Sequence, residues 1–294
     1  MDFEQDPVTS AQTVFLFSFS VLTAVLNSLV IITIWKDPFK QLKGTANSLI
    51  LNLAVCDLLM GFPTELLFAI LHWFPGNKDV IKAGYVTMYL AICASFLTIL
   101  GLAVERLIVI SSGKNEDSSA TSYHAIGIMS IWLLAGLTAS LPLLGWNSLN
   151  SYRMFIIDAI GVPVLILLFA CYTRIFLLVR KQLRRHFGTG DQRRELHPLT
   201  ANSQRMERLK RKERSVALSV FVLIGLFTLC WSPLFVVENI RECCDHEDCI
   251  PSKIIVIFQC LIFAHPLANP IAYALRTVKF RRALKRIFRR TDNN

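Results

Sequence analysis

TVFLFSFSVLTAVLNSLVIITIW, residues Thr13–Trp35, contains no charged residue and is long enough to cross a membrane as a helix. The hydrocarbon core of a bilayer is roughly 30 Å thick, and about 20 helical residues span it. Lipid offers the backbone no hydrogen-bond partners, and a helix satisfies its own backbone groups. This stretch therefore predicts a membrane-spanning helix.

Six further apolar stretches of comparable length follow along the chain. They run approximately Thr45–Leu71, Ile81–Ile110, Tyr123–Trp146, Met154–Val179, Val216–Ile240 and Ser252–Leu275. Charged residues make up only 18% of the 294 residues, and most of them lie between the apolar stretches. A soluble domain would carry charge throughout, so this pattern predicts an all-α bundle of seven transmembrane helices.

The chain after the seventh stretch is basic and amphipathic. Apolar residues recur at helical spacing from Val278 to Phe288, with lysines and arginines between them, which predicts a short eighth helix on the membrane surface. The expected parts are a short N-terminal segment (1–12), a seven-helix domain (13–276, with a polar loop at about 180–215) and an amphipathic helix with its tail (277–294).

Lysine and arginine are distributed unequally between the two sides of such a bundle. Of the 31, only Lys78, Lys82, Arg153, Arg241 and Lys253 fall on the side of the N-terminus. The basic side of a membrane protein faces the cytoplasm, so we expect an extracellular N-terminus, and we recognise no removable signal peptide before the first span. The net charge of +10 lies beside the spans, where topology and anionic lipid account for it, and we expect no nucleic-acid partner.

Five acidic residues fall inside the apolar stretches, where charge is costly and commonly functional, and Glu105 at the inner end of the third stretch is one of them. Asp57 lies near mid-depth of the second stretch, out of reach of either headgroup region. Glu65, Asp158 and Glu238 lie in the outer half of the membrane. Two interpretations stay open for these three: charges that reach the membrane interface, or groups that bind a ligand.

Three cysteines lie close together in the last outer loop, where oxidation is permitted. One disulfide can form there, either Cys243–Cys249 or Cys244–Cys249, and it leaves one thiol over. A zinc site with His246 is the alternative, which the crowding of the four residues disfavours.

A series of short motifs, one or two in each span, occurs in order along the chain. They are Asn27 in the first span, Leu53-Ala54-Val55-Cys56-Asp57 in the second, Ser95 and Glu105-Arg106-Leu107 in the third, Trp132 and Pro142 in the fourth, Pro163 and Tyr172 in the fifth, Cys230-Trp231-Ser232-Pro233 in the sixth and Asn269-Pro270-Ile271-Ala272-Tyr273 in the seventh. With these motifs the chain resembles the class A (rhodopsin-like) G-protein-coupled receptors.

The resemblance implies a receptor in the plasma membrane that transmits the binding of an extracellular ligand to a heterotrimeric G protein and catalyses no reaction. The sixth helix would move outward at a hinge formed by Trp231 and Pro233, because proline kinks a helix. Pro270 would loosen the seventh helix and leave a backbone carbonyl for Asn269 or water.

The resemblance also implies a polar core and a possible sodium ion in it. Asp57, Ser95 and Asn269 would converge in the bundle centre, where relatives hold sodium with waters, and oxygen ligands suit this hard cation. His265 stands where many relatives carry asparagine. It would bind Trp231 or Asp57, and when protonated it would compete with sodium; a buried structural histidine is the alternative.

A switch at the cytoplasmic end follows from the same resemblance. Arg106 needs a partner, because a buried unpaired arginine is costly. Glu105 is its neighbour, and Glu213 stands where relatives carry an acidic lock partner. We expect Arg106–Glu213 to hold the inactive state, and Tyr172, Tyr273 and the G protein to replace that contact in the active state.

The sequence indicates the subfamily and the ligand less clearly than it indicates the family. Leu141–Trp146 resembles adenosine and sphingosine-phosphate receptors, and Tyr273–Arg276 resembles melanocortin receptors. Phe235 and Glu238, however, replace the histidine and asparagine with which adenosine receptors grip the base. We expect a branch near these groups, with a ligand that the sequence does not identify.

Charge gives the one indication of ligand class. The outer acids Glu65, Asp158 and Glu238 would attract a cationic amine or a basic peptide over a long range. A transporter or channel would show inverted repeats or rings of charge, and an intramembrane enzyme would show a nucleophile with its base or a metal cluster. The sequence shows none of these features, so we expect neither class.

Overall fold

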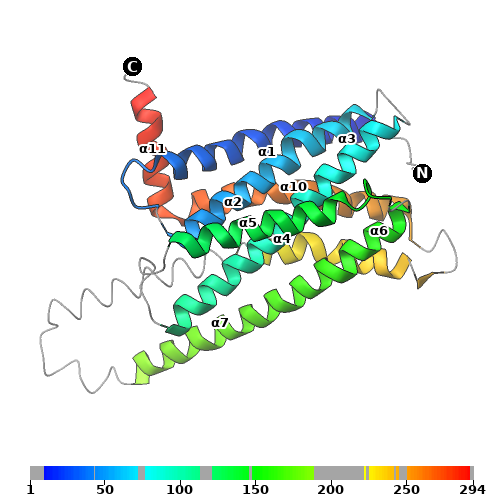
Figure 1. Cartoon of the computed structure of the whole chain (residues 1–294). Helices are drawn as coiled ribbons and strands as arrows, with labels where there is room; N and C mark the ends of the chain where they lie inside the picture. Colours follow the sequence, from blue (N-terminus) through cyan, green and yellow to red (C-terminus); the bar gives the residue numbers. More distant parts are fainter. Residues whose placement is uncertain are drawn as a thin grey trace, which may run out of the picture.

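The computed structural model describes residues 10–42, 44–71, 77–112, 121–145, 148–188, 222, 225–241, 243–244 and 250–291. Within these residues every regular element is a helix, and the long helices lie side by side in one bundle (Figure 1). The predicted all-α fold is confirmed.

Each predicted span has a helical counterpart. The helices are α1 (Ser10–Lys36); α2 (Thr45–Leu59) continued by η1 (Met60–Glu65) and α3 (Leu66–Ile70); α4 (Lys78–Ser112); α5 (Thr121–Ser140); α6 (Leu149–Ile156) continued by η3 (Ile157–Gly161) and α7 (Val162–Gly188); a sixth helix at 225–241; and α10 (Ser252–Arg276). The predicted amphipathic helix follows as α11 (Val278–Thr291), and it turns away from the bundle axis (Figure 1).

Length and composition agree with a membrane location. In the part of the chain that the structure describes, five helical segments are long and apolar enough to cross a bilayer. They are Thr13–Lys36, Thr45–Ile70, Lys78–Ser112, Ser151–Leu178 and Ile254–Ala274, and Ala125–Ser140 is a shorter apolar helix. α5 ends before the predicted Trp146, because turns occupy 141–145 and Pro142 in them has no N–H to donate.

The second span contains a wide π-helical turn, η1, that the sequence analysis did not predict. Pro63 lies inside it and cannot donate the hydrogen bond that residue 63 of a regular helix would give to the Leu59 carbonyl. The Thr64 hydroxyl donates to that carbonyl instead, at 3.1 Å. A π-helical turn holds more residues than an α-helical one, so the residues after it are rotated about the helix axis.

Three spans are joined through Asn52, which is buried in the middle of the core. Its Nδ2 donates to Thr98 Oγ1 of α4 at 2.7 Å. Its Oδ1 accepts from Trp132 Nε1 of α5 at 2.8 Å. One amide thus ties α2, α4 and α5 together, and a buried amide is stable only when such partners satisfy it.

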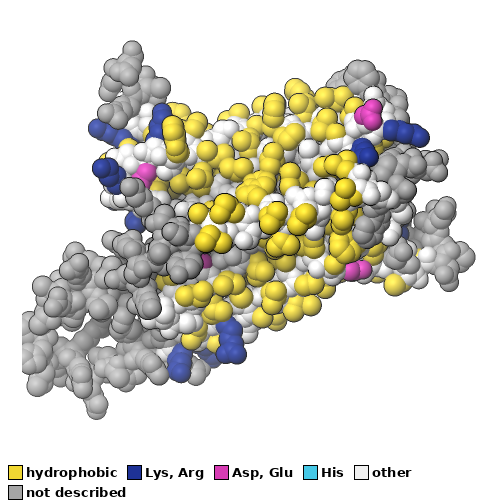
Figure 2. Space-filling model, viewed as in Figure 1, with side chains coloured by type: hydrophobic (Ala, Val, Ile, Leu, Met, Phe, Trp, Pro, Cys, Tyr) yellow, Lys and Arg dark blue, Asp and Glu magenta, His cyan; other side chains and the backbone are white. Residues whose placement is uncertain are grey.

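The outer surface of the bundle is apolar. Hydrophobic side chains cover the middle of the visible face, and lysine and arginine side chains gather towards its ends (Figure 2). Phe169, Leu229 and Leu133 are 74%, 71% and 65% exposed. A large apolar surface is unfavourable in water, so it is suited to face lipid.

Candidate functional site

The polar core lies where α2 and α10 meet. Asp57 and Asn269 are both buried, and Asn269 Nδ2 donates to Asp57 Oδ2 at 2.7 Å. The structure thus brings together two of the predicted core residues that are more than 200 positions apart in the sequence. Asn269 Nδ2 thus donates to Asp57 and not to the backbone carbonyl that Pro270 leaves without a donor.

That carbonyl is served by the first helix. Pro270 cannot donate to the Pro266 carbonyl one turn before it. Asn27 Nδ2 donates to the Pro266 oxygen at 3.2 Å, and it also donates to Thr23 in its own helix. Asn27 takes the place at this carbonyl that was expected for Asn269, and it joins α1 to the proline-containing part of α10.

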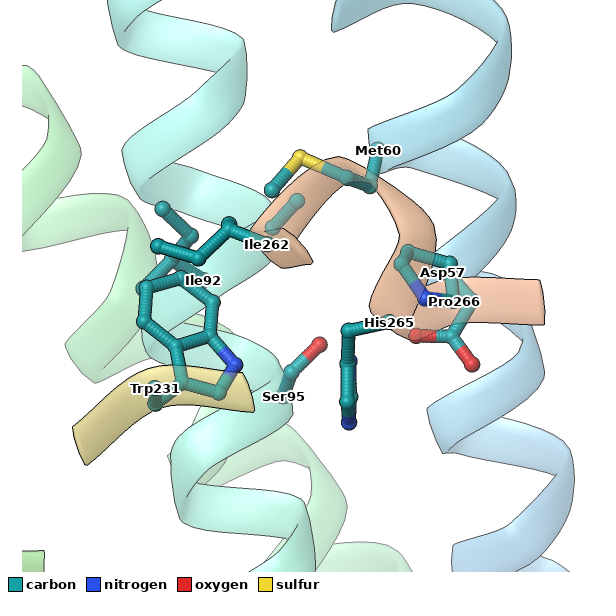
Figure 3. A pocket seen from close by; sticks show the side chains of 9 residues that line it. Asp57, Met60, Ile92, Ser95, Trp231, Ile262, His265 and Pro266 are labelled. Atoms are coloured by element: carbon teal, nitrogen blue, oxygen red, sulfur yellow. The ribbon is translucent and has the colours of Figure 1, made fainter. Parts of the chain in front are cut away.

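A small cavity of about 10 Å³ lies outward of this contact, between α2, α4, α10 and the sixth helix (Figure 3). Trp231 and Asp57 lie on opposite sides of it, with Ser95 and His265 between them. Such a volume is at the lower limit for one water molecule. Buried polar atoms near it have no hydrogen-bond partner within the described chain: Trp231 Nε1, His265 Nε2 and Asn269 Oδ1.

The cavity fits a small cation by its chemistry. Asp57 and Ser95 supply oxygen atoms to its lining, and oxygen is the ligand that hard cations prefer. Its volume leaves no room for several waters around an ion. His265 lines the same space, but it does not accept a hydrogen bond from Trp231, whose Nε1 is unpartnered. The part of the prediction that pairs these two residues was wrong.

An aromatic cluster couples the sixth helix to α4. The Phe96 ring lies edge-on to Trp231, Phe227 and Phe235, with centroid distances of 4.8, 4.9 and 6.0 Å. Phe227 also lies edge-on to His265, at 5.5 Å. Phe96 was missed by the sequence analysis, although the four-residue spacing of Phe227, Trp231 and Phe235 is a stripe on one helix face that could have indicated such a cluster.

The outer ends of the fifth span and the sixth helix are in close contact. A Cβ added to Gly161 would lie 2.6 Å from Phe235 Cζ, so a larger residue there would displace the Phe235 ring. Arg153 forms an ion pair with Glu238 at 3.1 Å, and Glu238 is 2% exposed. Glu238 is therefore a buried acid that is paired with Arg153.

The two other outer acids differ from each other. Asp158 is exposed, which agrees with an interface charge. Glu65 is fully buried, and neither of its carboxylate oxygens has a hydrogen-bond partner among the described residues. The sequence did not separate these three acids, because all of them lie at similar depth.

At the end predicted to be cytoplasmic, Arg106 is almost fully buried and pairs with its neighbour. Arg106 Nε lies 2.9 Å from Glu105 Oε2. Tyr273 is also buried, and its ring centroid lies 6.5 Å from that of Phe280 in α11. Tyr172 is half-buried in α7. Glu213, the predicted lock partner, lies outside the described residues.

The disulfide in the last outer loop differs from one of the two expected pairings. Cys244 is disulfide-bonded, whereas Cys243 is exposed and carries a free thiol. Cys243 as the bridging residue is thus wrong, and adjacent cysteines could not be distinguished without the backbone direction at each. Cys249 and His246 lie outside the described residues.

Comparison with known proteins agrees with the geometry. Residues 26–273 match the family described as 7 transmembrane receptor (rhodopsin family). Sphingosine 1-phosphate receptor 1 of Danio rerio is 24% identical over 95% of this chain and 78% of that protein. Adenosine receptor A2a of Homo sapiens is 25% identical over 92% and 70%. The structure of squid rhodopsin superposes with a TM-score of 0.82 at 19% identity, over 99% of this chain and 88% of that one.

Proposed function

This chain belongs to the rhodopsin family of 7 transmembrane receptors, and we propose that it carries a signal from an extracellular ligand to a heterotrimeric G protein by an outward motion of its sixth helix. In this proposal the protein lies in the plasma membrane with its N-terminus outside. The relatives reported above are receptors, and a receptor acts by shifting a conformational equilibrium and not by catalysis.

One observation carries the proposal: the aromatic cluster around Phe96 and Trp231 lies directly beside the Pro233 hinge and the Asp57 cavity. Pro233 lies within the sixth helix, two residues from Trp231. A change in the packing of Trp231 against Phe96 at 4.8 Å alters the direction of the helix at its weakest point. The cytoplasmic half then moves while the outer half stays in contact with Gly161.

The cytoplasmic end supplies the surface for the G protein. Arg106 is held by Glu105 within its own helix at 2.9 Å. Outward motion of the sixth helix would expose this arginine to a helical segment of the G protein, and Tyr172 and Tyr273 would support it there. Glu213 would hold the closed state against this motion, as the resemblance implies.

A sodium ion is part of the proposal for the closed state. Asp57 and Ser95 would hold it, and it would supply the positive charge that the buried carboxylate otherwise lacks. His265 in the same lining is the competing group, since its protonated form supplies positive charge there as well.

The ligand class we propose is cationic, either an amine or a basic peptide. Glu65 supports this choice, because its buried carboxylate has no partner in the described chain. Asp158 contributes only long-range attraction, and Glu238 is neutralised by Arg153. The two relatives are named for sphingosine 1-phosphate and adenosine, which are chemically unlike, so their names do not decide the ligand.

The test is a screen of amines, peptides, nucleosides and lipids in cells that report several G-protein pathways. Wild-type protein is expected to give nucleotide exchange with at least one ligand, and Arg106→Ala is expected to reduce it by roughly tenfold or more, which corresponds to about 1.4 kcal/mol. The lipid-facing variant Val25→Ala is the matched control and should signal as the wild type does. An unaltered response in Arg106→Ala would contradict the proposed coupling surface.

A further inference from the structure

The structure separates the three outer acids, and it buries Glu65 without a counter-charge among the residues that it describes. Arg153 neutralises Glu238, and Asp158 is exposed to the surroundings. Glu65 is 0% exposed, and both of its carboxylate oxygens are unpartnered within the described residues. A buried carboxyl without a partner is among the most costly groups to ionise in a protein, and a positive group beside it offsets that cost.

The π-helical turn is the reason why Glu65 is enclosed. Gly61 lies in the same turn and is in close contact with α1, since a Cβ there would lie 2.5 Å from Thr23 Cγ2. Glu65 follows Gly61 by four residues, about one turn further out. The turn is stabilised by the bond from Thr64 to Leu59, which the proline requires. The second span thus directs Glu65 into the bundle in its predicted outer half.

Aromatic rings lie on the outer side of this acid. Phe68 follows Glu65 by three residues, so the two lie on neighbouring positions of one helix face. Phe68 is edge-on to Tyr85 of α4 at 5.3 Å and to Phe263 of α10 at 6.0 Å. Tyr85 and Phe263 are only partly buried. Tyr85 and Phe263 therefore form the accessible rim, and the buried Phe68 and Glu65 lie further in.

From this arrangement we propose that Glu65, Phe68, Tyr85 and Phe263 form the binding site for an alkylammonium group of the ligand, an inference that rests on the proposed receptor function. The carboxylate supplies the opposite charge, and the ring faces attract the methyl or methylene groups that carry part of the positive charge. A desolvated site of this kind favours an ammonium on an apolar body over a strongly hydrated inorganic cation.

The site also has a physical connection to the proposed hinge. Met60, at the inner end of the same π-helical turn, lines the cavity that Trp231 and His265 share. An ammonium group that binds Glu65 acts on the outer end of η1. A displacement of this turn also displaces Met60 at its inner end. Binding at the rim is thereby coupled to the residue pair that sets the direction of the sixth helix.

The experiment measures thermal unfolding of the purified full-length protein in lipid nanodiscs with 2-phenylethylammonium, and with 2-phenylethanol as the neutral analogue of similar shape. Millimolar 2-phenylethylammonium is expected to raise the unfolding midpoint of the wild type, and 2-phenylethanol is not. Glu65→Gln should weaken ammonium binding by at least tenfold, whereas Asp79→Asn, a control at an exposed acid outside the site, should leave it unchanged.

Three results would overturn the inference: no shift in the wild type, an equal shift with the alcohol, or a shift retained in Glu65→Gln. Phe68→Leu provides a second variant that keeps the carboxylate, and it should weaken binding without abolishing it. The binding measurement uses no G protein, so it tests the site separately from signalling. A protein that binds the ammonium but does not stimulate nucleotide exchange would contradict the receptor proposal and would still support the binding site.

Discussion

At the scale of single residues, two prolines inside the spans, Pro63 and Pro270, are compensated by side-chain donors, one from the next residue and one from another span. Asn27 of α1 donates to the carbonyl that Pro270 leaves open in α10. Thr64 does the same for Pro63 within one turn. A backbone carbonyl without a hydrogen-bond partner in lipid or in a dry core costs about 1–3 kcal/mol. A kinked helix is therefore stable only when such side-chain bonds replace the lost backbone bond.

Gly61 lies in a close contact between η1 and α1. A Cβ at this position would lie 2.5 Å from Thr23 Cγ2 and 2.6 Å from Thr23 Cβ, so Gly61→Ala forces α1 and η1 apart. We expect it to lower the free energy of unfolding by roughly 1–3 kcal/mol, measured by thermal unfolding in nanodiscs. Gly136→Ala is the control, since nothing lies within 4 Å of that position and alanine favours a helix. Equal midpoints for the two variants would refute the close contact.

Asp57 is the residue at which a cation should act. Replacing sodium chloride by N-methylglucamine chloride at constant ionic strength is expected to lower the unfolding midpoint of the wild type, because an ion that binds only the folded state stabilises it. Asp57→Asn should abolish this difference, and Asp79→Asn, an exposed acid, should retain it. A sodium effect that survives in Asp57→Asn would place the ion elsewhere.

At the scale of elements, the sixth helix is held firmly at its outer end and has its weak point in the middle. The Gly161–Phe235 contact and the Arg153–Glu238 pair both join it to the fifth span. Pro233 lies inward of these contacts and interrupts the helical hydrogen bonds. In the proposed motion the sixth helix would turn at this proline.

The Arg153–Glu238 pair should respond asymmetrically to mutation. Arg153→Met leaves Glu238, which is 2% exposed, without a partner, and we expect a loss of about 3 kcal/mol or more. Glu238→Gln leaves Arg153, which is 24% exposed and can reach water, so the loss should be smaller. Thermal unfolding of both single variants and the double variant measures this. Comparable losses in both singles, with no recovery in the double, would speak against a buried pair.

At the scale of the whole molecule, the apolar belt and the basic ends define how the bundle lies in the membrane. Figure 2 shows both features on one face, and α1 begins at the end of the bundle opposite to α11 (Figure 1). The proposal of an extracellular N-terminus follows from the charge distribution along the sequence.

An epitope at each terminus tests this orientation. Antibody is expected to label an N-terminal epitope on intact cells and a C-terminal epitope only after permeabilisation. An even number of crossings would place both termini on one side, so labelling of both epitopes on intact cells, or of neither, would contradict the seven-span arrangement. An epitope in residues 113–120, a predicted cytoplasmic loop, serves as a further control.

Much of the architecture was open to prediction from the sequence. The order and approximate limits of the spans, the amphipathic α11 and the burial of Asp57 all follow from local hydrophobicity, which each segment carries by itself. The polar core was also anticipated, because Asn269 does bond Asp57 at 2.7 Å. The Phe96 cluster, by contrast, involves two helices, and no pattern within one of them names its partner.

By itself the sequence determined that this chain is a bundle of long apolar helices with a basic amphipathic helix after the last, since the transfer of apolar side chains from water to lipid depends on composition and length alone. Only the tertiary structure decided which side chain meets which: Asn27 with Pro266, Cys244 and not Cys243 in the disulfide, and Glu65 enclosed while Asp158 is exposed. The physical reason is that one extra residue in a π-helical turn rotates every later side chain about the helix axis. The hydrophobicity pattern along the chain does not show this rotation.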